Sequence, residues 1–546
     1  MTKIIGVSSA HDSSLCVYDK GKIEYFIKEE RLSRIKRDKM PILALNGFNY
    51  SNEELDLAYS SPTEDVDSFN NYLGIARKTH NIKNIYDYSN EHHLVHANLA
   101  FFNSGFTDSL VVVVDRNGSA FANSCRESET VYLASYPNNF KSLYKSFWIY
   151  DAYAHEAKKH IQEIFPETDI KIRSMFGITK VYETATSLIL QDSLENGKTM
   201  GLSAYGDKNI KYPEIFTDSL IPNDYYFSHE SLFGTNRNAT NADLQQFASK
   251  DITKDNYSFY ANYAWQIQKQ TQEALASLVD KHIKESGIKN VCITGGYGLN
   301  VVANHYLTTV FPDVNFYFEP IADDSGNSIG SAMKAYRDST LDNNIYKLKH
   351  TFFNGKKHNL DYIEGKSITV DDVAKLIASG KSVALYHGLA EAGPRALGNR
   401  SILFDPRDVN AKDKVNKIKN REWYRPFAGM VLEEDANIFF DMGRLDKSEF
   451  MTISFPVKSL SETSIPGIVH FDKTCRVQTV GKNNIIPYEL LKSFKNITGI
   501  GVILNTSFNL AGQPLVETPQ EALGTLYDSP LDYVWFPEIG KIVGKS

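Results

Sequence analysis

The amino-acid sequence predicts an α/β fold, and three features lead to that prediction. Short apolar runs typical of buried strands alternate along the chain with amphipathic helical patterns. The apolar runs are rich in β-branched residues and are bounded by turn signals. At 546 residues, of which 42% are hydrophobic, the chain is long enough to bury the cores of several domains.

Six apolar runs are predicted to be strands. They are IIGVS (4–8), LVVVVD (110–115), NVCITGG (290–296), VNFYFEP (314–320), SVALYHG (382–388) and GVILNTS (501–507). A long helix is predicted over 263–287, because the apolar residues recur with helical spacing and the pattern ends in a glycine typical of a C-cap. The polar stretch 338–366 is broken by Asn and Gly and precedes a new helix–strand unit, so we predict a domain boundary there.

The bulk composition argues against several classes of protein. A net charge of -7 argues against non-specific binding to nucleic acid or to an anionic membrane. No apolar run approaches the roughly 20 residues that span a bilayer. The first residues enter a strand without a signal-peptide pattern, and the four cysteines form no C-x-x-C pair. We therefore expect a cytoplasmic protein with no disulfide scaffold and no zinc ribbon.

The stretch EHHLVHANLAFF (91–102) contains three histidines followed by apolar residues typical of a helix. On a helix, residues four apart lie on the same face, so His92 and His96 point the same way and His93 points elsewhere. Two imidazoles on one face could hold a metal ion. Taken alone, the same pattern is more often a polar helix start with chance histidines.

Acidic residues follow two of the predicted strands. Asp115 comes directly after the run LVVVV, and Asp323 and Asp324 come after VNFYFEP. Ligands of α/β proteins bind at the carboxyl ends of strands. Imidazoles and carboxylates together suit iron, zinc or manganese. The common placement at strand ends favours the metal-site interpretation.

The N-terminal stretch 6–34 is predicted to contain strands joined by turns, with His11 and Asp12 in a turn of small residues. This is how actin-like ATPases begin, although an ordinary hairpin explains the segment as well. His11 could be a general base or a satisfied structural histidine.

Two glycine-rich turns are candidates for nucleotide contacts. ITGGYGLNVVAN (293–304) places Gly295 and Gly296 between a strand and a helix that begins near Asn300. NGKTMGLSAYGD (196–207) carries Lys198, with a plain loop as the alternative. Neither turn has the spacing of a Rossmann fingerprint or a P-loop.

The C-terminal part concentrates basic residues in EAGPRALGNRSILFDPRD (391–408) and NKIKNREWYRPFA (416–428). Guanidinium groups bind phosphate and carboxylate in a bidentate manner. Glycine and proline between the arginines favour a loop that lines a small anion pocket over a solvated face. LNTSFN (504–509) adds a polar edge with Asn505, Ser507 and Asn509. The basic residues in and between the stretches 391–408 and 416–428 are Arg395, Arg400, Arg407, Arg421 and Arg425, with Lys414, Lys417 and Lys419.

Taken in order, these motifs resemble the ATP-dependent O-carbamoyltransferases of antibiotic and nodulation-factor biosynthesis. The motifs are H-D-S-S, E-E-R-x-S-R, H-H-x-x-H-A, G-K-x-M-G-L-x-x-Y-G, G-G-x-x-L-N, G-P-R-A-L-G-N-R-S-I-L-x-D-P-R and L-N-T-S-F-N. The chain departs from the family in three places. It reads DRNGSA where the family reads D-G-x-G-E, it fits poorly over 147–187, and it has a lysine before the Arg476 motif where glycine is usual.

The resemblance implies an actin-like (ASKHA) domain over 1–345 and a YrdC-like domain over 346–546. By that resemblance, the second domain makes carbamoyl adenylate from carbamoyl phosphate and ATP, and the first transfers the carbamoyl group to a hydroxyl. It implies His92, His96, Asp115 and Asp324 as metal ligands. It implies catalytic roles for His11, Asp12, Arg395 and Arg425. The implied ligand-binding residues are Lys198, Gly295, Gly296, Asn300, Arg400, Lys414, Arg421, Arg476, Asn505 and Ser507.

The expected co-substrates are ATP and carbamoyl phosphate, with a divalent metal, iron by the resemblance, and Mg²⁺ for ATP. The expected partner is a small-molecule hydroxyl acceptor, with a homodimer left open and neither membrane nor nucleic acid expected. Three alternatives remain: an ASKHA-type kinase, a threonylcarbamoyl-transfer protein acting on tRNA, and an ATP-binding switch without chemistry. A kinase would release ADP rather than pyrophosphate.

Overall fold

The computed structural model describes residues 2–48, 50, 53–62, 66–121, 125–149, 154–174, 177–217, 252–340 and 342–545. Two compact units make up the chain. Unit 1 comprises Met1–Ala10, Leu15–Lys22 and Phe48–Leu348, and unit 2 comprises His11–Ser14, Ile23–Gly47 and Lys349–Ser546.

Unit 1 contains two sheets. The first has the order β2-β1-β4-β5, with β1 (Lys3–Ser8), β2 (Ser14–Asp19), β4 (Glu54–Ser60) and β5 (Asn81–Asp87). In it β1, β4 and β5 are parallel. The second has the order β10-β9-β8-β6-β11-β12. Its strands are β6 (Asp108–Val114), β8 (Cys125–Ser135), β9 (Asn139–Ile149), β10 (Asp169–Ser174), β11 (Asn290–Thr294) and β12 (Asn315–Phe318), and the short β7 (Ala120–Phe121) pairs with β8.

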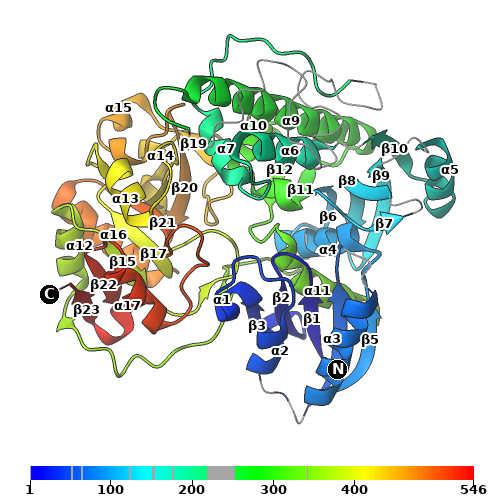
Figure 1. Ribbon diagram of the computed structural model, residues 1–546, viewed down its shortest axis with the longest axis horizontal. Coiled ribbons are helices and arrows are strands. Elements are labelled where there is room, and N and C mark those ends of the chain that lie inside the picture. Colours follow the sequence, from blue (N-terminus) through cyan, green and yellow to red (C-terminus); the bar gives the residue numbers. More distant parts are fainter. Residues whose placement is uncertain are drawn as a thin grey trace. The chain divides into compact units, whose positions relative to one another are not determined.

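Helices α11 (Asn327–Ser339) and α4 (His92–Ser104) pack against each other between the two sheets (Figure 1). Helix α11 contacts β1 and β4, whereas α4 contacts β6, β8 and β11. The approach of α11 to β1 requires glycine, because a Cβ on Gly6 would lie 1.8 Å from the carbonyl oxygen of Ser328. This packing brings the ends of α4, β6 and α11 together.

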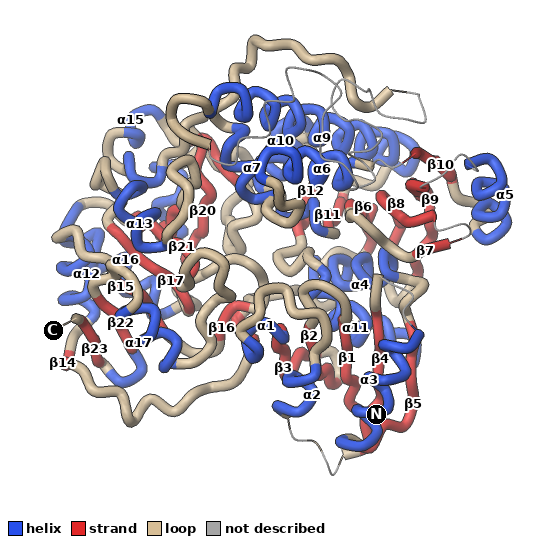
Figure 2. Tube along the Cα trace, viewed as in Figure 1, coloured by secondary structure: helices blue, strands red, loops and turns tan. Residues whose placement is uncertain are grey.

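Further helices of unit 1 pack around α9 (Tyr257–Ser286). They are α6 (Ile178–Leu190), α7 (Asn196–Ser203) and α10 (Val301–Val310), which Figure 2 shows grouped near α9. Unit 1 also contains α3 (Val66–Thr79) and α5 (Ala154–Ile164). The end of α9 is a left-handed Gly287, as the glycine C-cap signal predicts.

Unit 2 is built on a mixed sheet with the order β14-β23-β22-β15-β17-β21-β18-β20-β19. Its central strands are β15 (Val383–Tyr386), β17 (Arg400–Phe404), β18 (Ala428–Leu432), β20 (Thr474–Val480), β21 (Val502–Ser507) and β22 (Tyr533–Phe536); its outer strands are β14 (Lys366–Ser367), β19 (Ser454–Pro456) and β23 (Lys541–Gly544). The strands β16 (Ala390–Glu391), β13 (Phe352–Asn354) and β3 (Lys22–Lys28) lie together in the same unit. Two short N-terminal helices, α1 (Glu29–Ser33) and α2 (Ile42–Gly47), also belong to it.

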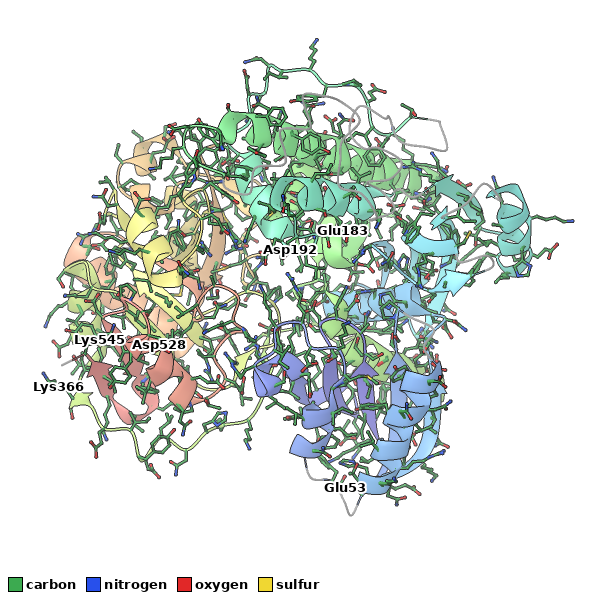
Figure 3. The ribbon with its side chains drawn as sticks, viewed as in Figure 1. Glu53, Glu183, Asp192, Lys366, Asp528 and Lys545 are labelled. Atoms are coloured by element: carbon green, nitrogen blue, oxygen red, sulfur yellow. The ribbon has the colours of Figure 1, made fainter. Side chains whose placement is uncertain are left out.

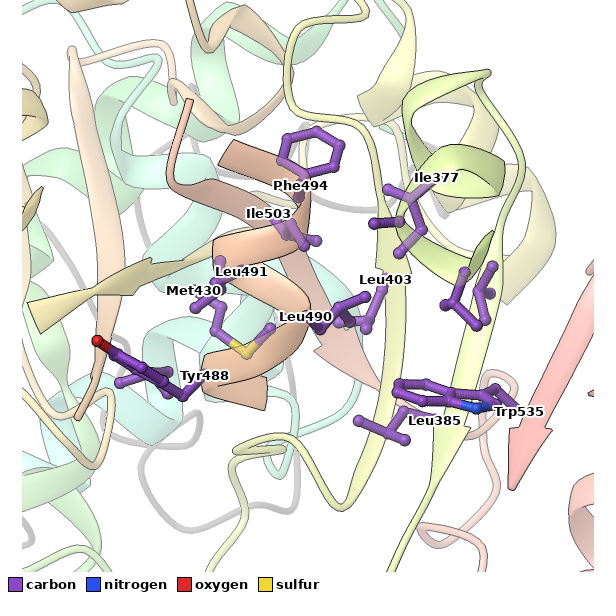
Figure 4. Packing of buried hydrophobic residues seen from close by; sticks show 14 of the residues in the cluster. Ile377, Leu385, Leu403, Met430, Tyr488, Leu490, Leu491, Phe494, Ile503 and Trp535 are labelled. Atoms are coloured by element: carbon purple, nitrogen blue, oxygen red, sulfur yellow. The ribbon is translucent and has the colours of Figure 1, made fainter. Parts of the chain in front are cut away.

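Helices α12 (Val370–Ala378) and α16 (Ile485–Thr498) pack side by side on the mixed sheet. Leu490 and Phe494 on α16 and Trp535 on β22 lie in a buried apolar cluster with strand residues such as Leu403 (Figure 4). Helices α13 (Ala411–Lys419) and α17 (Pro519–Tyr527) also belong to the unit. Helix α17 begins with a capping box between Thr518 and Glu521.

The predicted α/β class is confirmed, and each of the six predicted strands coincides with an observed one. The long helix is confirmed as α9 and extends six residues further toward the N-terminus than predicted. The domain assignment over 1–345 and 346–546 stays a prediction. The four cysteines are free and buried. Within the described ranges, no helix is both long and apolar enough to cross a membrane.

Candidate functional site

Helix α4 carries the two histidines that the sequence predicted to share one face. His92 and His96 are fully buried, and their ring centroids lie 4.8 Å apart. His93 faces elsewhere, with its Nδ1 2.7 Å from Thr130 Oγ1. The helix begins where the His92 backbone N–H donates to Ser119 Oγ at 3.0 Å. Ser119 lies in the segment DRNGSA after β6, and its hydroxyl oxygen accepts from a helix N–H that has no partner within the helix.

Two carboxylates complete this cluster from distant parts of the chain. His92 Nε2 lies 3.5 Å from Asp115 Oδ2 and 3.4 Å from Asp324 Oδ1, and His96 Nε2 lies 3.3 Å from the same Asp324 oxygen. Asp115 directly follows β6, and Asp324 begins a 3-10 turn, η4 (Asp324–Gly326), just before α11. One ligand atom from each of the four residues lies within 4.8 Å of the others, so together they could hold a metal ion.

The electrostatics of the cluster favour a cation between the carboxylates. Burial alone would lower the pKa of His92, but Asp324 and Asp115 raise it to about 10. Burial and Asp324 raise the pKa of Asp115, but His92 and His96 outweigh them, so it falls below its usual range. The raised pKa of His92 means that a proton supplies positive charge to the two buried carboxylates, and a metal cation bound between them would supply it in place of that proton.

Neighbouring residues hold the ligands in place. Asn327, which the sequence analysis missed, directs its Nδ2 to His96 Nε2 at 3.0 Å. On the strand side, Glu127 and Lys145 form a buried ion pair, and Glu127 Oε2 accepts from the Ser119 backbone N–H at 3.2 Å. The signal for Asn327 was its place at the start of the small-residue helix after Asp324.

The turn at Gly295 and Gly296 supports this cluster rather than presenting free N–H groups of a helix. Gly295 has φ +84°, and a Cβ there would lie 2.5 Å from the carbonyl oxygen of Val114. The Gly296 N–H donates to Asp115 Oδ1 at 3.1 Å. The first N–H groups of α10 are capped by Asn300, whose Oδ1 accepts from Val302 and Ala303.

The other predicted nucleotide-turn residue of unit 1 is engaged in an ion pair. Lys198 on α7 lies 3.7 Å from Glu195 Oε2, one turn away on the same segment.

In unit 2, His11 and Asp12 lie beside a buried lysine. Asp12 Oδ2 is 3.6 Å from His11 Nδ1, and Asp12 Oδ1 accepts from Lys28 Nζ at 3.2 Å. Lys28 is only 5% exposed at its side chain, whereas that of His11 is 39% exposed. Glu30 Oε1 also lies 3.8 Å from Lys28 Nζ. The carboxylate of Asp12 thus joins an accessible imidazole to a buried ammonium.

Four cationic side chains form a second cluster in unit 2: Lys419, Arg421, Arg425 and Arg476. Burial and the neighbouring Arg421 and Arg425 hold the pKa of Lys419 well below its usual range. Burial, with a contribution from Arg425, lowers the pKa of Arg476 to about 10. Arg425 Nη1 lies 3.5 Å from Glu422 Oε2, so one carboxylate accompanies the four cations, and a bound anion would offset the positive charge that remains.

The LNTSFN motif borders this cationic cluster. Lys419 Nζ donates to Ser507 Oγ at 3.1 Å and to Asn509 Oδ1 at 2.9 Å. Asn505 Nδ2 donates to the carbonyl oxygen of Ala396, in the G-P-R-A-L-G motif, at 3.1 Å. The sequence analysis named Lys419 only as part of a basic run, and its burial at the end of α13 distinguishes it from the other lysines there.

Other predicted basic residues are engaged elsewhere. The buried Arg400 donates to the carbonyl oxygens of His387 and Gly388 and lies 3.7 Å from the centroid of Tyr386. Lys414 pairs with Asp408 at 2.6 Å. Arg395 is half-buried in the loop between β16 and β17. The anion-binding roles predicted for these three residues stay predictions, and Arg400 and Lys414 already have other partners.

Comparison with known proteins identifies the family. The family model for the carbamoyltransferase N-terminus matches residues 69–333, and the model for the carbamoyltransferase C-terminus matches residues 374–541. The chain belongs to the carbamoyltransferase family. It is therefore an enzyme of the carbamoyl-transfer class, and the resemblance seen in the sequence is confirmed at that level.

Relatives extend over most or part of the chain. The uncharacterized protein sll1178 of Synechocystis sp. is 26% identical and covers 98% of this chain and 95% of its own length. Nodulation protein NolNO of Sinorhizobium fredii is 29% identical over 81% of this chain and 62% of its own. The crystal structure of HypF from T. kodakarensis shares 11% identity, with a TM-score of 0.38 over 62% of this chain and 48% of its own. That structural similarity is too low to define the fold.

Proposed function

We propose that this carbamoyltransferase is an ATP-dependent O-carbamoyltransferase that works in two half-reactions. In the first, carbamoyl phosphate and ATP give carbamoyl adenylate, and in the second a hydroxyl of a small-molecule acceptor takes the carbamoyl group. The observation that carries the proposal is the cationic cluster of unit 2, in which Lys419 is buried and the three arginines are partly buried, because neither a kinase nor an ATP-binding switch requires such an anion site beside its ATP site.

The first half-reaction is assigned to unit 2. Its atom balance requires that carbamoyl phosphate release phosphate to water and that a carbamate oxygen then attack the α-phosphorus of ATP, with loss of pyrophosphate. Carbamoyl phosphate, carbamate, ATP and pyrophosphate are all anions. Arg421, Arg425 and Arg476 would bind them, with Lys419 held toward the cluster by Ser507 and Asn509. Partly desolvated guanidinium groups stabilise developing phosphate charge strongly.

The second half-reaction is assigned to the N-terminal part of the chain, 1–345, which contains both the His–Asp cluster and His11. His92, His96, Asp115 and Asp324 would hold a divalent metal, for which two neutral imidazoles and two carboxylates are a suitable donor set. A metal ion in such a site supplies a positive charge that polarises a phosphoryl or carbonyl oxygen. Within the described part of the chain, His92 Nε2 is buried without a hydrogen-bond partner and faces both carboxylates, so it is available as a ligand atom.

His11 is proposed as the base that takes the proton of the acceptor hydroxyl. Its exposed imidazole can reach a ligand, and Asp12, held by Lys28, would orient it. Attack of the alcohol oxygen on the carbamoyl carbon forms the carbamate ester and breaks the bond to AMP. Formation of carbamoyl adenylate needs no such base.

The test separates the two half-reactions. We expect wild-type protein with carbamoyl phosphate and ATP to release pyrophosphate and not ADP. The Arg476→Met variant should lose pyrophosphate release about 10²–10³-fold, as expected when a contact to a reacting phosphate is lost. The His11→Ala variant should keep pyrophosphate release and lose acceptor carbamoylation roughly 10²–10⁴-fold.

Three results would count against the proposal. Release of ADP would indicate a kinase, and an unchanged pyrophosphate rate in Arg476→Met would remove the cationic cluster from the reaction. Equal loss of both half-reactions in His11→Ala would remove His11 as the base.

A further inference from the structure

A charged group lies at the carboxyl end of the central strand β6, next to Asp115. Arg116 Nε lies 2.7 Å from Glu183 Oε2, and Lys180 Nζ lies 3.5 Å from the same oxygen. Glu183 and Lys180 belong to α6, where Figure 3 labels Glu183. The side chains of Glu183 and Lys180 are nearly buried, whereas that of Arg116 is 33% exposed. Two cations therefore share one carboxylate at a strand end where α/β proteins bind ligands.

The contacts fix Arg116 by its inner atoms and leave its outer edge open. The backbone carbonyl of Arg116 accepts from Trp148 Nε1 at 3.0 Å, and Glu183 engages Nε. Among the described residues, the terminal Nη1 and Nη2 groups of Arg116 donate no hydrogen bond. These two parallel N–H groups form the edge that binds phosphate or carboxylate in a bidentate manner.

The group carries an excess positive charge, which is unexpected in a chain of net charge -7. Lys180 is 11% exposed at its side chain and lies 5.6 Å from the centroid of the Trp148 ring. Burial and Arg116 lower the pKa of Lys180, against the opposing effect of Glu183. A surplus cation held in an apolar setting is costly unless an anion joins it.

The residues of this group come from two segments of unit 1 that are distant in the sequence. Arg116 belongs to DRNGSA, and Trp148, Lys180 and Glu183 fall within 147–187. The structure brings the two segments into contact.

We propose that Arg116 and Lys180 form an anion subsite for a phosphate or carboxylate group of a ligand in the transfer half-reaction. This inference rests on the proposed carbamoyl transfer. Two sources share that chemistry: an anionic group on the hydroxyl acceptor, or the phosphate of the adenylate. Glu183 is a positioning residue that orients both cations.

The experiment compares the wild type with Arg116→Met, Arg116→Lys and a control, Lys281→Met. Lys281 is also an ion-paired lysine of unit 1, 2.7 Å from Asp169 Oδ2. In calorimetric titration with inorganic phosphate, the wild type and the control should bind one more phosphate than Arg116→Met. This readout needs no turnover, so it still decides the subsite if the protein releases no pyrophosphate and the proposed function fails.

Steady-state kinetics then distinguish the two sources. Acceptors are offered in pairs, glycerol with glycerol 3-phosphate and ribose with ribose 5-phosphate. If the subsite binds an anionic group of the acceptor, the phosphorylated member of each pair should have a KM at least 10-fold lower, with kcat little changed. This KM difference should be lost in Arg116→Met and partly kept in Arg116→Lys. If the subsite binds the phosphate of the adenylate, the KM values within each pair should be equal. Arg116→Met should then lower the rate of transfer from preformed carbamoyl adenylate. Equal phosphate stoichiometry and equal kinetics in all variants would overturn the subsite.

Discussion

Glu319 provides a test of how the metal-ligand cluster is supported. It lies between β12 and the loop that carries Asp324, and it is fully buried. Its carboxyl accepts from Asn103 Nδ2 at the end of α4 at 3.1 Å, from Tyr317 Oη at 3.1 Å and from the Ile321 N–H at 2.9 Å. Glu319 thus connects the helix that bears His92 with the loop that bears Asp324.

The shifted pKa of Glu319 gives the size of its pH-dependent contribution to the free energy of unfolding. Burial raises it from 4.5 to about 7, although the three hydrogen bonds oppose the shift. Between these two pH values the folded protein holds a proton that the unfolded chain has lost. The contribution of Glu319 is therefore fully present below pH 4.5 and is lost as the pH rises to about 7. At 1.36 kcal/mol for each pH unit, the loss is about 3 kcal/mol at most.

The Glu319→Gln variant removes this dependence, because a neutral amide of the same shape can keep the contacts with Asn103 and Ile321. Urea unfolding of the full chain from pH 4.5 to 8 gives the free energy of unfolding of unit 1 for wild type and variant. As the pH rises across this range, we expect the free energy of unfolding of the wild type to fall by about 2–3 kcal/mol relative to that of Glu319→Gln. Glu53→Gln, at an exposed carboxylate of the same unit, controls for loss of a surface charge. A difference that does not change with pH would show that Glu319 does not hold the proton.

Three further predictions concern the cluster, the general base and the core. His92→Ala should lower the metal content measured by elemental analysis while the circular dichroism spectrum stays unchanged. Full metal occupancy in this variant would reject the site, and His160→Ala, at an exposed histidine, is the control. Lys28→Met should lower acceptor carbamoylation roughly 10–100-fold through loss of a charged hydrogen bond to Asp12, whereas Lys28→Arg should keep most of the activity. Equal carbamoylation rates in the wild type and Lys28→Met would exclude a role of Lys28 in holding Asp12. Leu490→Ala should destabilise unit 2 by about 2–5 kcal/mol in denaturant unfolding, unlike Leu460→Ala at a side chain that is 93% exposed; equal stability would contradict the packing.

Local pattern was enough to predict many of the elements. Helix α4 and the common face of His92 and His96 follow from spacing, because a helix repeats every 3.6 residues whatever surrounds it. The place of Asp115 after β6 follows from a run of β-branched residues that ends there. The basic and glycine-rich character of the C-terminal motifs predicts anion binding, and this stays a prediction.

Tertiary packing decided which of the candidate side chains meet. Asp323 and Asp324 are adjacent, yet Asp323 accepts from the Ser325 N–H at 3.1 Å while Asp324 faces both histidines. Arg400 and Arg421 belong to the same basic region, yet Arg400 is bound to backbone carbonyls, and Arg421 lies among other cations.

The pairs of Lys28 with Asp12 and of Arg116 with Glu183 join residues whose separation carries no periodic signal. Sequence spacing sets which face of an element a side chain occupies. The partner on a distant element is set by sheet order and helix packing, which many long-range contacts determine together.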